Sequence, residues 1–531
     1  MFDKHSYIKQ MAHSTLTGWF KNQVQKTPDN IAVEIKGQFL TYSELDERSN
    51  YVGWALLNSG VKKEEIVAVM TERSIETVIG LLGVLKAGAA FLAIDISNPL
   101  ERIRFVLQDS GAKAVLTNTW KYDYVKENFP IEVYAINIAN TRKEPTGITR
   151  QPTDLAYAIY TSGTTGAPKG ALNEDVGLVN YIYEHVKDKS YDNGSVMLQK
   201  ATCSFDASLF EIFSTLLSGG KLQLLTEQEN ESFFDTLRVI KDNNVTHLGM
   251  IPTILSALLD YMESSNQQSS FSNIRKLYIG GEELTVPLLE KYSRVTGADC
   301  SYISNAYGPS ECSIGATEYD VGSETLDKSS PVPIGKPLNG ISIYIMNDGK
   351  LCDVGEEGEL YIGGIAVGRG YINRPELTAE KFIQNPICAN ERIYRSGDLA
   401  KWNENGNIIF LGRIDEQVKL NGLRIELTEI KNRLLEYPGV IDAAVVLKNE
   451  PDRKYLIGYL VSKNQDDEDQ IKEHLRQFLP DYMIPLQYIY LDKLPFTKNG
   501  KLDKNALPNS TPRYIKDSSY SMIEAAEEVE V

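Results

Sequence analysis

Apolar and polar positions follow two alternating rhythms between residues 29 and 410. Short apolar runs rich in β-branched residues predict buried strands, and the clearest are IAVEI, IVAVM, AVLTN, LYIGG and SIYIM. Longer patterns of helical period lie between them, such as SIETVIGLLGVLKAG at 74–88. Strands that alternate with helices are typical of sheets covered by helices, so the pattern predicts a large α/β domain of layered sheets and helices.

The pattern changes character near residue 412. The run FLGRIDEQVKLNGLRIELTEIKNRLLEYPGVIDAAVVL predicts a charged turn, a hairpin around Gly422, a helix from Glu426 and a strand over 443–447. Strands and helices are then expected to alternate to the end of a small α+β domain. The predicted limits are 1–412 for the large domain, 413–416 for the connection, 417–508 for the small domain and 509–531 for a polar linker or tail.

Charge and cysteine content narrow the classes of function. The net charge of −17 repels phosphate backbones and anionic lipid, so neither a nucleic acid nor a membrane is expected as a partner. Five cysteines without a C-x-x-C pair indicate neither a disulfide framework nor a zinc site. The most apolar stretch, 78–94, is interrupted by Lys86 and predicts a buried helix and strand. A cytoplasmic, monomeric protein is expected.

Residues 155–170, LAYAIYTSGTTGAPKG, combine an apolar strand with a loop of small and hydroxylated residues that closes on Lys169. Such a loop offers backbone N–H groups, hydroxyls and one cation to a phosphate chain, and its glycines permit a close approach. The loop is not a Walker P-loop, because Gly170 follows the lysine where that pattern needs Ser or Thr. Phosphate binding is the favoured interpretation, and a surface turn of small residues is the alternative.

The string TSGTTGAPKG closely resembles the signature of the acyl-adenylate-forming superfamily, which includes acyl-CoA synthetases, luciferases and the adenylation domains of nonribosomal peptide synthetases. Further segments resemble the core motifs of those adenylation domains in the same order, over about residues 20–507. These segments are LTYSEL (40–45), LKAGAAFLAID (85–95), FDAS (205–208), NAYGPSE (305–311), GELYIGG (358–364), YRSGDLAKW (394–402), GRIDEQVKLNGLRIEL (412–427) and NGKLD (499–503).

The resemblance implies an ATP-dependent ligase that forms an acyl adenylate with the help of Mg²⁺. The residues implied in ATP and AMP binding are Thr161, Ser162, Gly163, Thr164, Thr165, Gly166, Lys169, Asn305, Ala306, Tyr307, Gly308, Ser310, Asp398, Phe410, Arg413 and Lys501. Glu311 is expected to coordinate Mg²⁺ together with a hydroxyl of Thr165 or Ser310, since hard cations prefer oxygen ligands. Without the motif, Glu311 would be interpreted as a solvated surface charge.

Asp398 resembles the aspartate that accepts both ribose hydroxyls, and Tyr307 and Phe410 resemble the aromatic faces beside the nucleoside. The alternatives are a helix cap for Asp398 and core positions for the two rings. The implied catalytic residues are Lys501, Glu311, Thr165 and Lys169.

Lys501 resembles the lysine that bridges the substrate carboxylate and the α-phosphate, although a lysine in such a loop is by default a surface charge. The family also implies a hinge at Asp415, about which the small domain turns after adenylation. The acyl group would then pass to the phosphopantetheine thiol of a peptidyl carrier protein or domain.

Asp206 indicates an α-amino acid as the acid, because a buried carboxylate needs a cationic partner such as the substrate ammonium. A helix N-cap is the alternative role for this residue. The other residues expected to line the side-chain pocket carry no charge. They include three glycines and several apolar residues, which favours a large apolar substrate side chain, with aromatic side chains as the first choice. The expected substrate-binding residues are Asp206, Ala207, Phe210, Gly249, Tyr278, Gly280, Ala306, Ile314, Gly315 and Lys501.

Two positions depart from the pattern of the resembling family. Asp175 stands where a histidine is common, so the role of that histidine cannot be transferred, and GMIPT replaces a common Pro-Pro pair near Gly249. Two further functions stay open: an acyl- or aryl-CoA ligase of the same superfamily, and a nucleotide-binding module without catalysis. Asp206 counts against the first, and the joint presence of Lys169, Glu311, Asp398 and Lys501 counts against the second.

Overall fold

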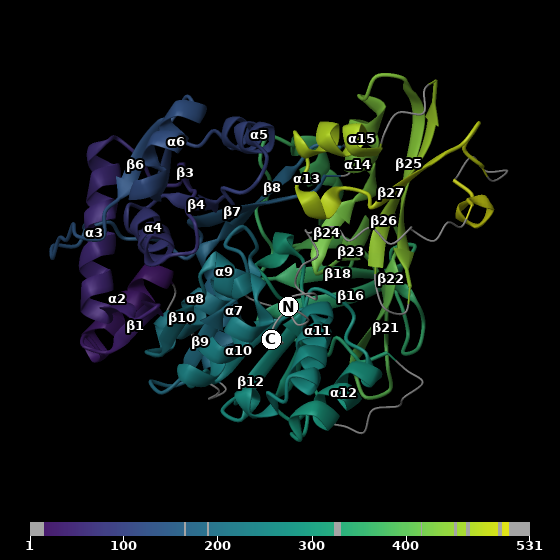
Figure 1. Cartoon of the computed structure of the whole chain (residues 1–531). Helices are drawn as coiled ribbons and strands as arrows, with labels where there is room; N and C mark the ends of the chain where they lie inside the picture. Colours follow the sequence, from purple (N-terminus) through teal and green to yellow (C-terminus); the bar gives the residue numbers. More distant parts are fainter. Residues whose placement is uncertain are drawn as a thin grey trace, which may run out of the picture. The chain divides into compact units, whose positions relative to one another are not determined.

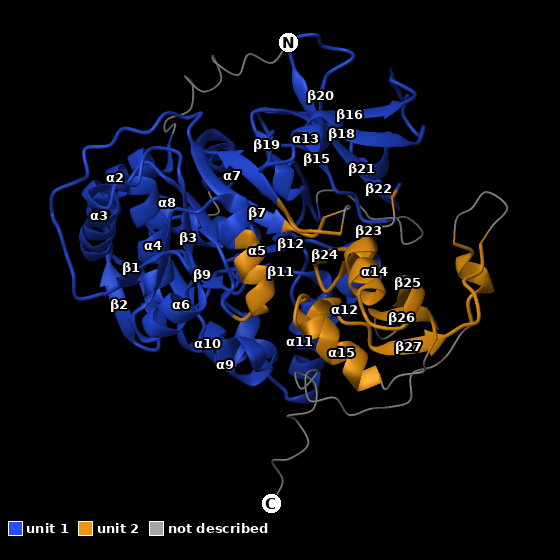
Figure 2. Ribbon diagram, turned by 90° about the horizontal axis from the view of Figure 1, so that it is seen from above, with its two compact units in different colours: residues 1–96, 107–160, 170–414 blue, residues 97–106, 161–169, 415–531 orange. Residues whose placement is uncertain are grey.

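The computed structural model describes residues 15–163, 166–187, 191–322, 331–415, 417–450, 454–463, 468–496 and 502–508. The chain divides into two compact units, which Figure 2 distinguishes by colour. Unit 1 comprises 1–96, 107–160 and 170–414, and unit 2 comprises 97–106, 161–169 and 415–531. The boundary at 414/415 lies at the predicted connection, whereas the assignment of 161–169 to unit 2 has no counterpart in the sequence pattern.

The largest sheet of unit 1 has nine strands, and its central strands are parallel. Because the carboxyl ends of parallel strands meet at one edge of a sheet, the loops after these strands gather there. In spatial order the strands are β15 (Lys336–Pro337), β14 (Thr317–Asp320), β13 (Ile303–Tyr307), β12 (Lys276–Gly280), β11 (His247–Met250), β9 (Val196–Gln199), β10 (Lys221–Leu224), β1 (Ile31–Ile35) and β2 (Gln38–Thr41).

Two further sheets complete the β-structure of unit 1 (Figure 1). The first has seven strands in the order β19 (Gly370–Tyr371), β8 (Lys169–Glu174), β7 (Leu155–Thr161), β4 (Ala90–Ala93), β3 (Ile66–Val69), β5 (Ala114–Asn118) and β6 (Glu132–Ile136). The second is antiparallel, in the order β17 (Lys350–Leu351), β16 (Ile341–Asn347), β18 (Gly358–Gly364), β21 (Arg392–Trp402) and β20 (Phe382–Gln384), and β22 (Ile408–Arg413) also pairs with β21.

Helices cover the sheets, and none of those in the described ranges combines the length and apolar character that a bilayer-spanning segment requires. The helices up to residue 381 are α2 (Leu16–Lys26), α3 (Tyr42–Asn58), α4 (Ile75–Lys86), α5 (Leu100–Ser110), α6 (Tyr122–Asn128), α7 (Asp175–Lys187), α8 (Ala207–Ser218), α9 (Glu227–Glu231), α10 (Phe233–Asp242), α11 (Pro252–Ser264), α12 (Val286–Thr296) and α13 (Pro375–Lys381).

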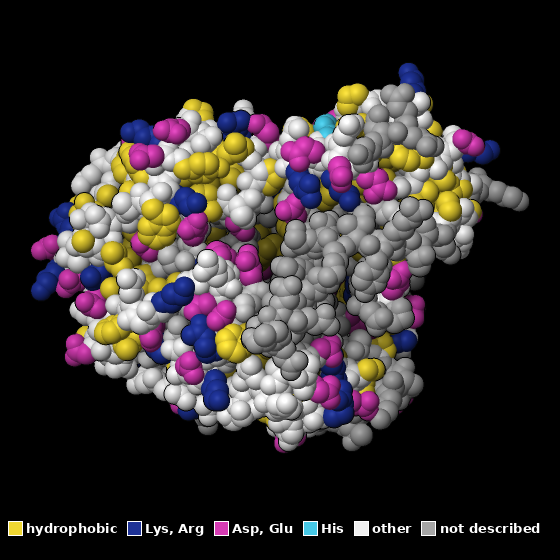
Figure 3. Space-filling model, viewed as in Figure 1, with side chains coloured by type: hydrophobic (Ala, Val, Ile, Leu, Met, Phe, Trp, Pro, Cys, Tyr) yellow, Lys and Arg dark blue, Asp and Glu magenta, His cyan; other side chains and the backbone are white. Residues whose placement is uncertain are grey.

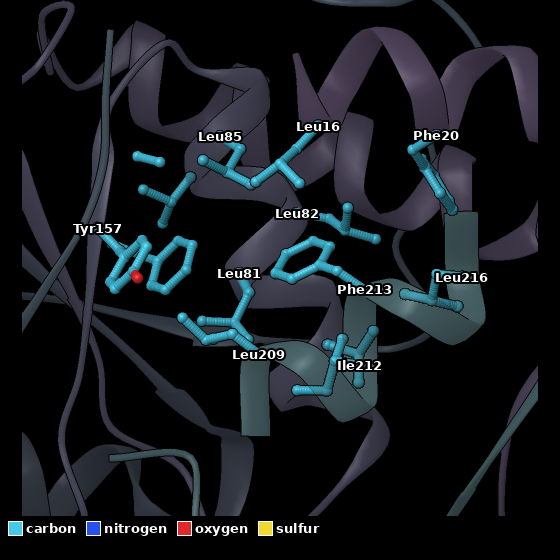
Figure 4. Close-up of a cluster of buried hydrophobic side chains, with 14 of the residues drawn as sticks. Leu16, Phe20, Leu81, Leu82, Leu85, Tyr157, Leu209, Ile212, Phe213 and Leu216 are labelled. Atoms are coloured by element: carbon cyan, nitrogen blue, oxygen red, sulfur yellow. The ribbon is translucent and has the colours of Figure 1, made fainter. Parts of the chain in front are cut away.

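Helices α4 and α8 form the centre of the unit 1 core. Every residue of α4 is buried, as expected for a helix that is apolar on all sides. In Figure 4, Leu209 and Phe213 of α8 lie against Leu81 and Leu82 of α4, near the ring of Tyr157 from β7. This packing anchors α8, and with it the segment that carries Asp206.

The C-terminal part of unit 2 contains a hairpin, a three-stranded sheet and two helices. The turn of the hairpin is Asn421–Gly422, both with positive φ, which suits a tight turn between antiparallel strands. The elements are β23 (Gln417–Leu420), β24 (Leu423–Glu426), α14 (Leu427–Leu435), β25 (Val440–Asn449), β26 (Lys454–Ser462), α15 (Glu468–Arg476) and β27 (Gln487–Tyr490). The expected strict alternation is wrong here, because β25 and β26 are consecutive antiparallel partners.

Candidate functional site

The phosphate loop joins the end of β7 at Thr161 to the start of β8 at Lys169. Gly166 has a φ of +86° and donates its N–H to the Gly163 carbonyl at 2.9 Å, which closes a tight turn. A Cβ on Gly163 would lie 1.9 Å from the Ala167 oxygen, so only glycine fits there. Thr164 and Thr165, predicted to contact phosphate and metal, lie outside the described residues.

Within unit 2, the phosphate loop contacts the β23–β24 hairpin. The Ser162 hydroxyl donates to the Arg424 carbonyl at 2.7 Å and accepts from the Glu426 N–H at 3.1 Å. Burial raises the pKa of the Glu426 carboxyl, and the ammonium of the buried Lys169 is the strongest influence against that rise. The loop therefore brings a cation and close-packed backbone together, as anion binding requires.

The residues predicted for the nucleoside form one hydrogen-bonded group in unit 1. Asp398 and Arg413 are direct cross-strand partners in β21 and β22, and the Arg413 guanidinium donates to Asp398 Oδ1 at 2.8 Å. The Tyr307 hydroxyl donates to Asp398 Oδ2. The rings of Tyr307 and Phe410 lie 6.3 Å apart. Asp398 is therefore a strand residue held at both oxygens, and the helix-cap alternative is wrong.

Glu311 is fully buried in a single 3₁₀ turn (Ser310–Cys312) that follows β13. The Tyr371 hydroxyl donates to its Oε1 at 2.7 Å, and the N–H of Gly368 donates to its carbonyl at 2.9 Å. The Ser310 carbonyl accepts from Asn173 Nδ2 at 2.9 Å. These bonds tie the turn to β8 and β19, and burial excludes the alternative of a solvated surface charge.

The described residues contain no group of three His, Cys, Asp or Glu side chains that could hold a metal ion. A single buried carboxylate suits Mg²⁺ nonetheless, because this ion is commonly bound by one or two carboxylates together with substrate phosphates and water. Glu311 thus fits the expected ion as a protein ligand beside a nucleotide.

Asp206 is the N-cap residue of α8, as the alternative interpretation expected, but its side chain makes no capping hydrogen bond. Its Oδ2 atom is shielded from solvent and has no hydrogen-bond partner among the described residues. Burial raises the pKa of this carboxyl to about 6, although a hydrogen bond from Ser310 opposes the rise. An oxygen buried in this way indicates a missing donor, such as an ammonium group.

The strand ends of the nine-stranded sheet bring most of the predicted substrate residues together. Gly249 of β11 pairs with Tyr278 of β12, and Gly280 of β12 pairs with Ala306 of β13. Phe210 of α8 contacts Tyr278 with ring centroids 4.7 Å apart in an edge-to-face arrangement. The predicted pocket therefore has two orthogonal aromatic rings on neighbouring elements.

Neighbouring groups lie close to two of the three glycines in the predicted pocket. A Cβ on Gly315 would lie 2.2 Å from the ring of Tyr181, and one on Gly280 would lie 2.9 Å from the Ala306 oxygen. Ile314 has a φ of +78°, a strained conformation for a β-branched residue, so the backbone of this loop is constrained at the predicted pocket. Neighbouring side chains and backbone therefore occupy part of the space that glycine vacates.

Other predicted residues have separate surroundings. The Asn305 side-chain amide donates to the Pro333 carbonyl at 2.8 Å. Gly308 packs against Gly315, because a Cβ added to Gly308 would lie 2.4 Å from the Gly315 Cα. Ala207 is exposed at the start of α8. Asp415, the expected hinge residue, is exposed and accepts from the Gln417 N–H at 3.2 Å. Lys501 lies outside the described residues.

Sequence patterns gave no signal for Tyr371 or for two buried ion pairs. Arg150 and Asp175 form a 2.6 Å ion pair with both side chains buried, and Asp175 also accepts from the Leu16 N–H at 2.8 Å. His185 and Glu318 form a second pair at 2.8 Å. The partners are far apart in the chain, and no motif or spacing joins them.

Charged side chains of both signs are interspersed on the face of the molecule in Figure 3. Over the described residues on that face, Lys and Arg are not gathered into one basic patch.

Residues 20–372 match the family described as AMP-binding enzyme, and residues 429–501 match the AMP-binding enzyme C-terminal domain. Gramicidin S synthase 2 of Brevibacillus brevis is 41% identical over 96% of this chain, which spans 11% of that protein. Zwittermicin A synthase ZmaJ of Bacillus cereus is 36% identical over 92% of this chain and 93% of its own length.

A solved structure with a similar fold is NpsA-ThdA, an artificially fused adenylation-PCP di-domain of a nonribosomal peptide synthetase from Klebsiella oxytoca. It aligns with a TM-score of 0.78 and 27% identity, over 89% of this chain and 93% of its own. The two-part α/β architecture expected from the sequence is therefore confirmed.

Proposed function

The chain belongs to the AMP-binding enzymes and resembles the adenylation domains of nonribosomal peptide synthetases, and from this premise we propose that it activates an amino acid with ATP. The products of this reaction are an aminoacyl adenylate and pyrophosphate. Family membership supports adenylate formation, whereas the amino acid as substrate rests on one observation in the site.

That observation is the unpartnered oxygen of Asp206. Its Oδ2 atom is buried and finds no donor among the residues that the structure describes, and the side chain makes no capping hydrogen bond to α8. A carboxylate in this position gains most from a cationic donor, because a charge-assisted hydrogen bond is stronger than a neutral one. The α-ammonium of an amino acid supplies such a donor, and a fatty or aryl acid does not.

The nucleotide is assigned to the group around Asp398. The carboxylate can accept the two ribose hydroxyls in addition to its bonds from Tyr307 and Arg413, since each oxygen carries two acceptor sites. Tyr307 and Phe410 offer apolar faces to the nucleoside. Mg²⁺ bound by Glu311 would supply positive charge to the phosphate oxygens.

In the first step a carboxylate oxygen of the amino acid attacks the α-phosphorus of ATP. A bond from this oxygen to the α-phosphorus forms, the bond from the α-phosphorus to the bridging oxygen breaks, and pyrophosphate leaves with that oxygen. The substrate is its own nucleophile, so the enzyme contributes orientation and charge stabilisation. We assign Lys501 to the carboxylate and the α-phosphate, and the phosphate loop with Lys169 to the departing phosphates.

In a second step the thiol sulfur of a carrier phosphopantetheine attacks the acyl carbon, AMP leaves, and the thiol gives up its proton. The similarity to an adenylation-PCP di-domain supports a carrier as the acceptor. Residues 413–416 are proposed as the hinge between the two steps, with Asp415 at its centre. The unit boundary between Ile414 and Asp415 supports this position.

For the substrate side chain we propose a large apolar group, with aromatic amino acids first. The edge-to-face pair of Phe210 and Tyr278 supports an aromatic substrate, because aromatic rings prefer such surroundings.

Pyrophosphate exchange into ATP, measured with the twenty amino acids and with aryl and fatty acids, tests the proposal. Exchange that depends on an α-amino acid is expected, most strongly with Phe, Trp or Tyr. Exchange only with acids that lack the amino group, followed by transfer to free CoA, would identify an acyl- or aryl-CoA ligase. No exchange with any acid, despite ATP binding, would identify a non-catalytic nucleotide-binding module.

A further inference from the structure

A buried histidine and a glutamate meet beside the predicted side-chain pocket. His185 of α7 places Nε2 2.8 Å from Glu318 Oε2, and its Nδ1 lies 2.7 Å from the Tyr181 carbonyl. Glu318 lies on β14 directly opposite Ala306 of β13, one of the predicted pocket residues. The imidazole therefore lies between the Tyr181 carbonyl and the Glu318 carboxylate, and the pair adjoins the pocket through the sheet.

The imidazole ring also touches the two aromatic walls. Its centroid lies 4.9 Å from that of Phe210 and 5.4 Å from that of Tyr278, in both cases edge to face. The ring of Tyr181, which fills the space beside Gly315, lies 4.4 Å from the same imidazole. His185 thus occupies the corner where three aromatic rings around the pocket meet.

The surroundings of the pair favour its ionised form. Burial lowers the pKa of His185, but the Glu318 carboxylate and its hydrogen bond raise it further, so the net direction is upward. Burial raises the pKa of Glu318, but the imidazolium outweighs this effect and holds it at about 2. Lys276 is a further charged group near the pair, and it lies 2.7 Å from Asp320 and 5.7 Å from the Tyr278 ring centroid.

We infer that the His185–Glu318 ion pair determines side-chain specificity by holding the rings of Phe210 and Tyr278 in the orthogonal arrangement that accepts an uncharged aromatic side chain. This inference rests on the proposed amino-acid activation. Because each charge of the pair satisfies the other, neither offers a partner to a charged substrate side chain, which would be buried at a high cost. His185 acts through the two rings and is a positioning residue.

The proposal can be tested without leaving a lone buried charge. Replacing one member of a buried pair is strongly destabilising, whereas replacing both by apolar residues is often tolerated. The test variant is therefore His185→Leu with Glu318→Leu. The matched control is Arg150→Met with Asp175→Leu, which removes a buried ion pair that also involves α7.

Pyrophosphate exchange gives KM for ATP and for each amino acid of an aromatic, aliphatic and charged panel. For the His185/Glu318 double variant we expect KM for the preferred amino acid to rise about tenfold or more. The difference in KM between the preferred amino acid and the rest of the panel should decrease, and KM for ATP should stay within about twofold of the wild-type value. The control should keep the wild-type preference. An unchanged preference in the double variant would overturn the inference.

A second variant covers the case in which the double variant does not fold. Glu318→Gln keeps the shape and the hydrogen bond but removes the negative charge, and the same rise of amino-acid KM at constant ATP KM is expected. Wild-type values in Glu318→Gln would reject the inference as well. Lack of amino-acid-dependent exchange in the wild-type enzyme would instead reject the proposed function, so the two failures are distinguishable.

Discussion

The Tyr371 hydroxyl donates a 2.7 Å hydrogen bond to Glu311 Oε1, and both side chains are buried. The Tyr371 ring packs on Phe382, as does that of Tyr394, whose hydroxyl lies 3.5 Å from that of Tyr371. Tyr371 therefore orients the carboxylate that we assign to Mg²⁺. Groups that orient a metal ligand also affect the affinity of the site for the metal.

Tyr371→Phe is expected to weaken binding of the divalent cation by about 10- to 100-fold, because Glu311 loses its orienting donor. The measurements are the Mg²⁺ dependence of pyrophosphate exchange and Mn²⁺ binding in the presence of ATP by electron paramagnetic resonance. Tyr394→Phe is the control, because it removes the hydroxyl that lies next to that of Tyr371, and it should change the cation affinity much less. Equal effects of the two variants would contradict an orienting role for Tyr371.

Asp206 predicts a pH dependence of amino-acid use. Burial raises the pKa of its carboxyl to about 6, so the charge that binds the ammonium is present above this pH and disappears below it. We expect kcat/KM for the amino acid to fall as the pH decreases through about 6, because this parameter reports ionisation of the free enzyme.

Asp206→Asn should raise KM for the amino acid roughly 10- to 100-fold, as expected for loss of a hydrogen bond to a charged group, and remove this pH dependence. KM for ATP at neutral pH serves as the internal control and should change little. Persistence of the acidic limb in Asp206→Asn would assign it to another group.

Lys501→Ala is expected to reduce adenylation about 100- to 1,000-fold, the range for loss of one preorganised charge partner in a transition state. ATP binding measured by calorimetry should be nearly unchanged, because the remaining nucleotide residues are intact. Lys504→Ala, an exposed lysine of the same small domain, is the matched control and should retain wild-type exchange. Normal exchange by Lys501→Ala would remove this lysine from the mechanism.

Asp175 predicts a stability effect without a change of chemistry. It pairs with Arg150 and accepts from Leu16, so Asp175→Leu leaves the guanidinium buried without its carboxylate. The free energy of unfolding should decrease by about 3–5 kcal/mol, and by less in the double variant with Arg150→Met. Guanidinium unfolding followed by circular dichroism measures both values. Additive losses in the double variant would show that the two residues are energetically independent.

Local patterns were sufficient for the alternation of strands and helices in the large domain. The Asn421–Gly422 turn and the buried helix α4 follow from residue type and periodicity over a few neighbouring positions, and the structure contains both. The alternation expected in the small domain was wrong, because an apolar run does not specify whether its neighbour is a helix or an antiparallel strand.

The sequence by itself determined the family, and it singled out the loop 161–170, Asp206, Glu311 and Asp398 as candidates, because each lies within a contiguous motif. Only the tertiary structure decided which groups meet them. Strand register places Arg413 opposite Asp398 and Glu318 opposite Ala306, and packing brings Tyr371 to Glu311 and Tyr181 to the space beside Gly315. Such pairings depend on distant segments packed in three dimensions, so no local spacing in the chain encodes them.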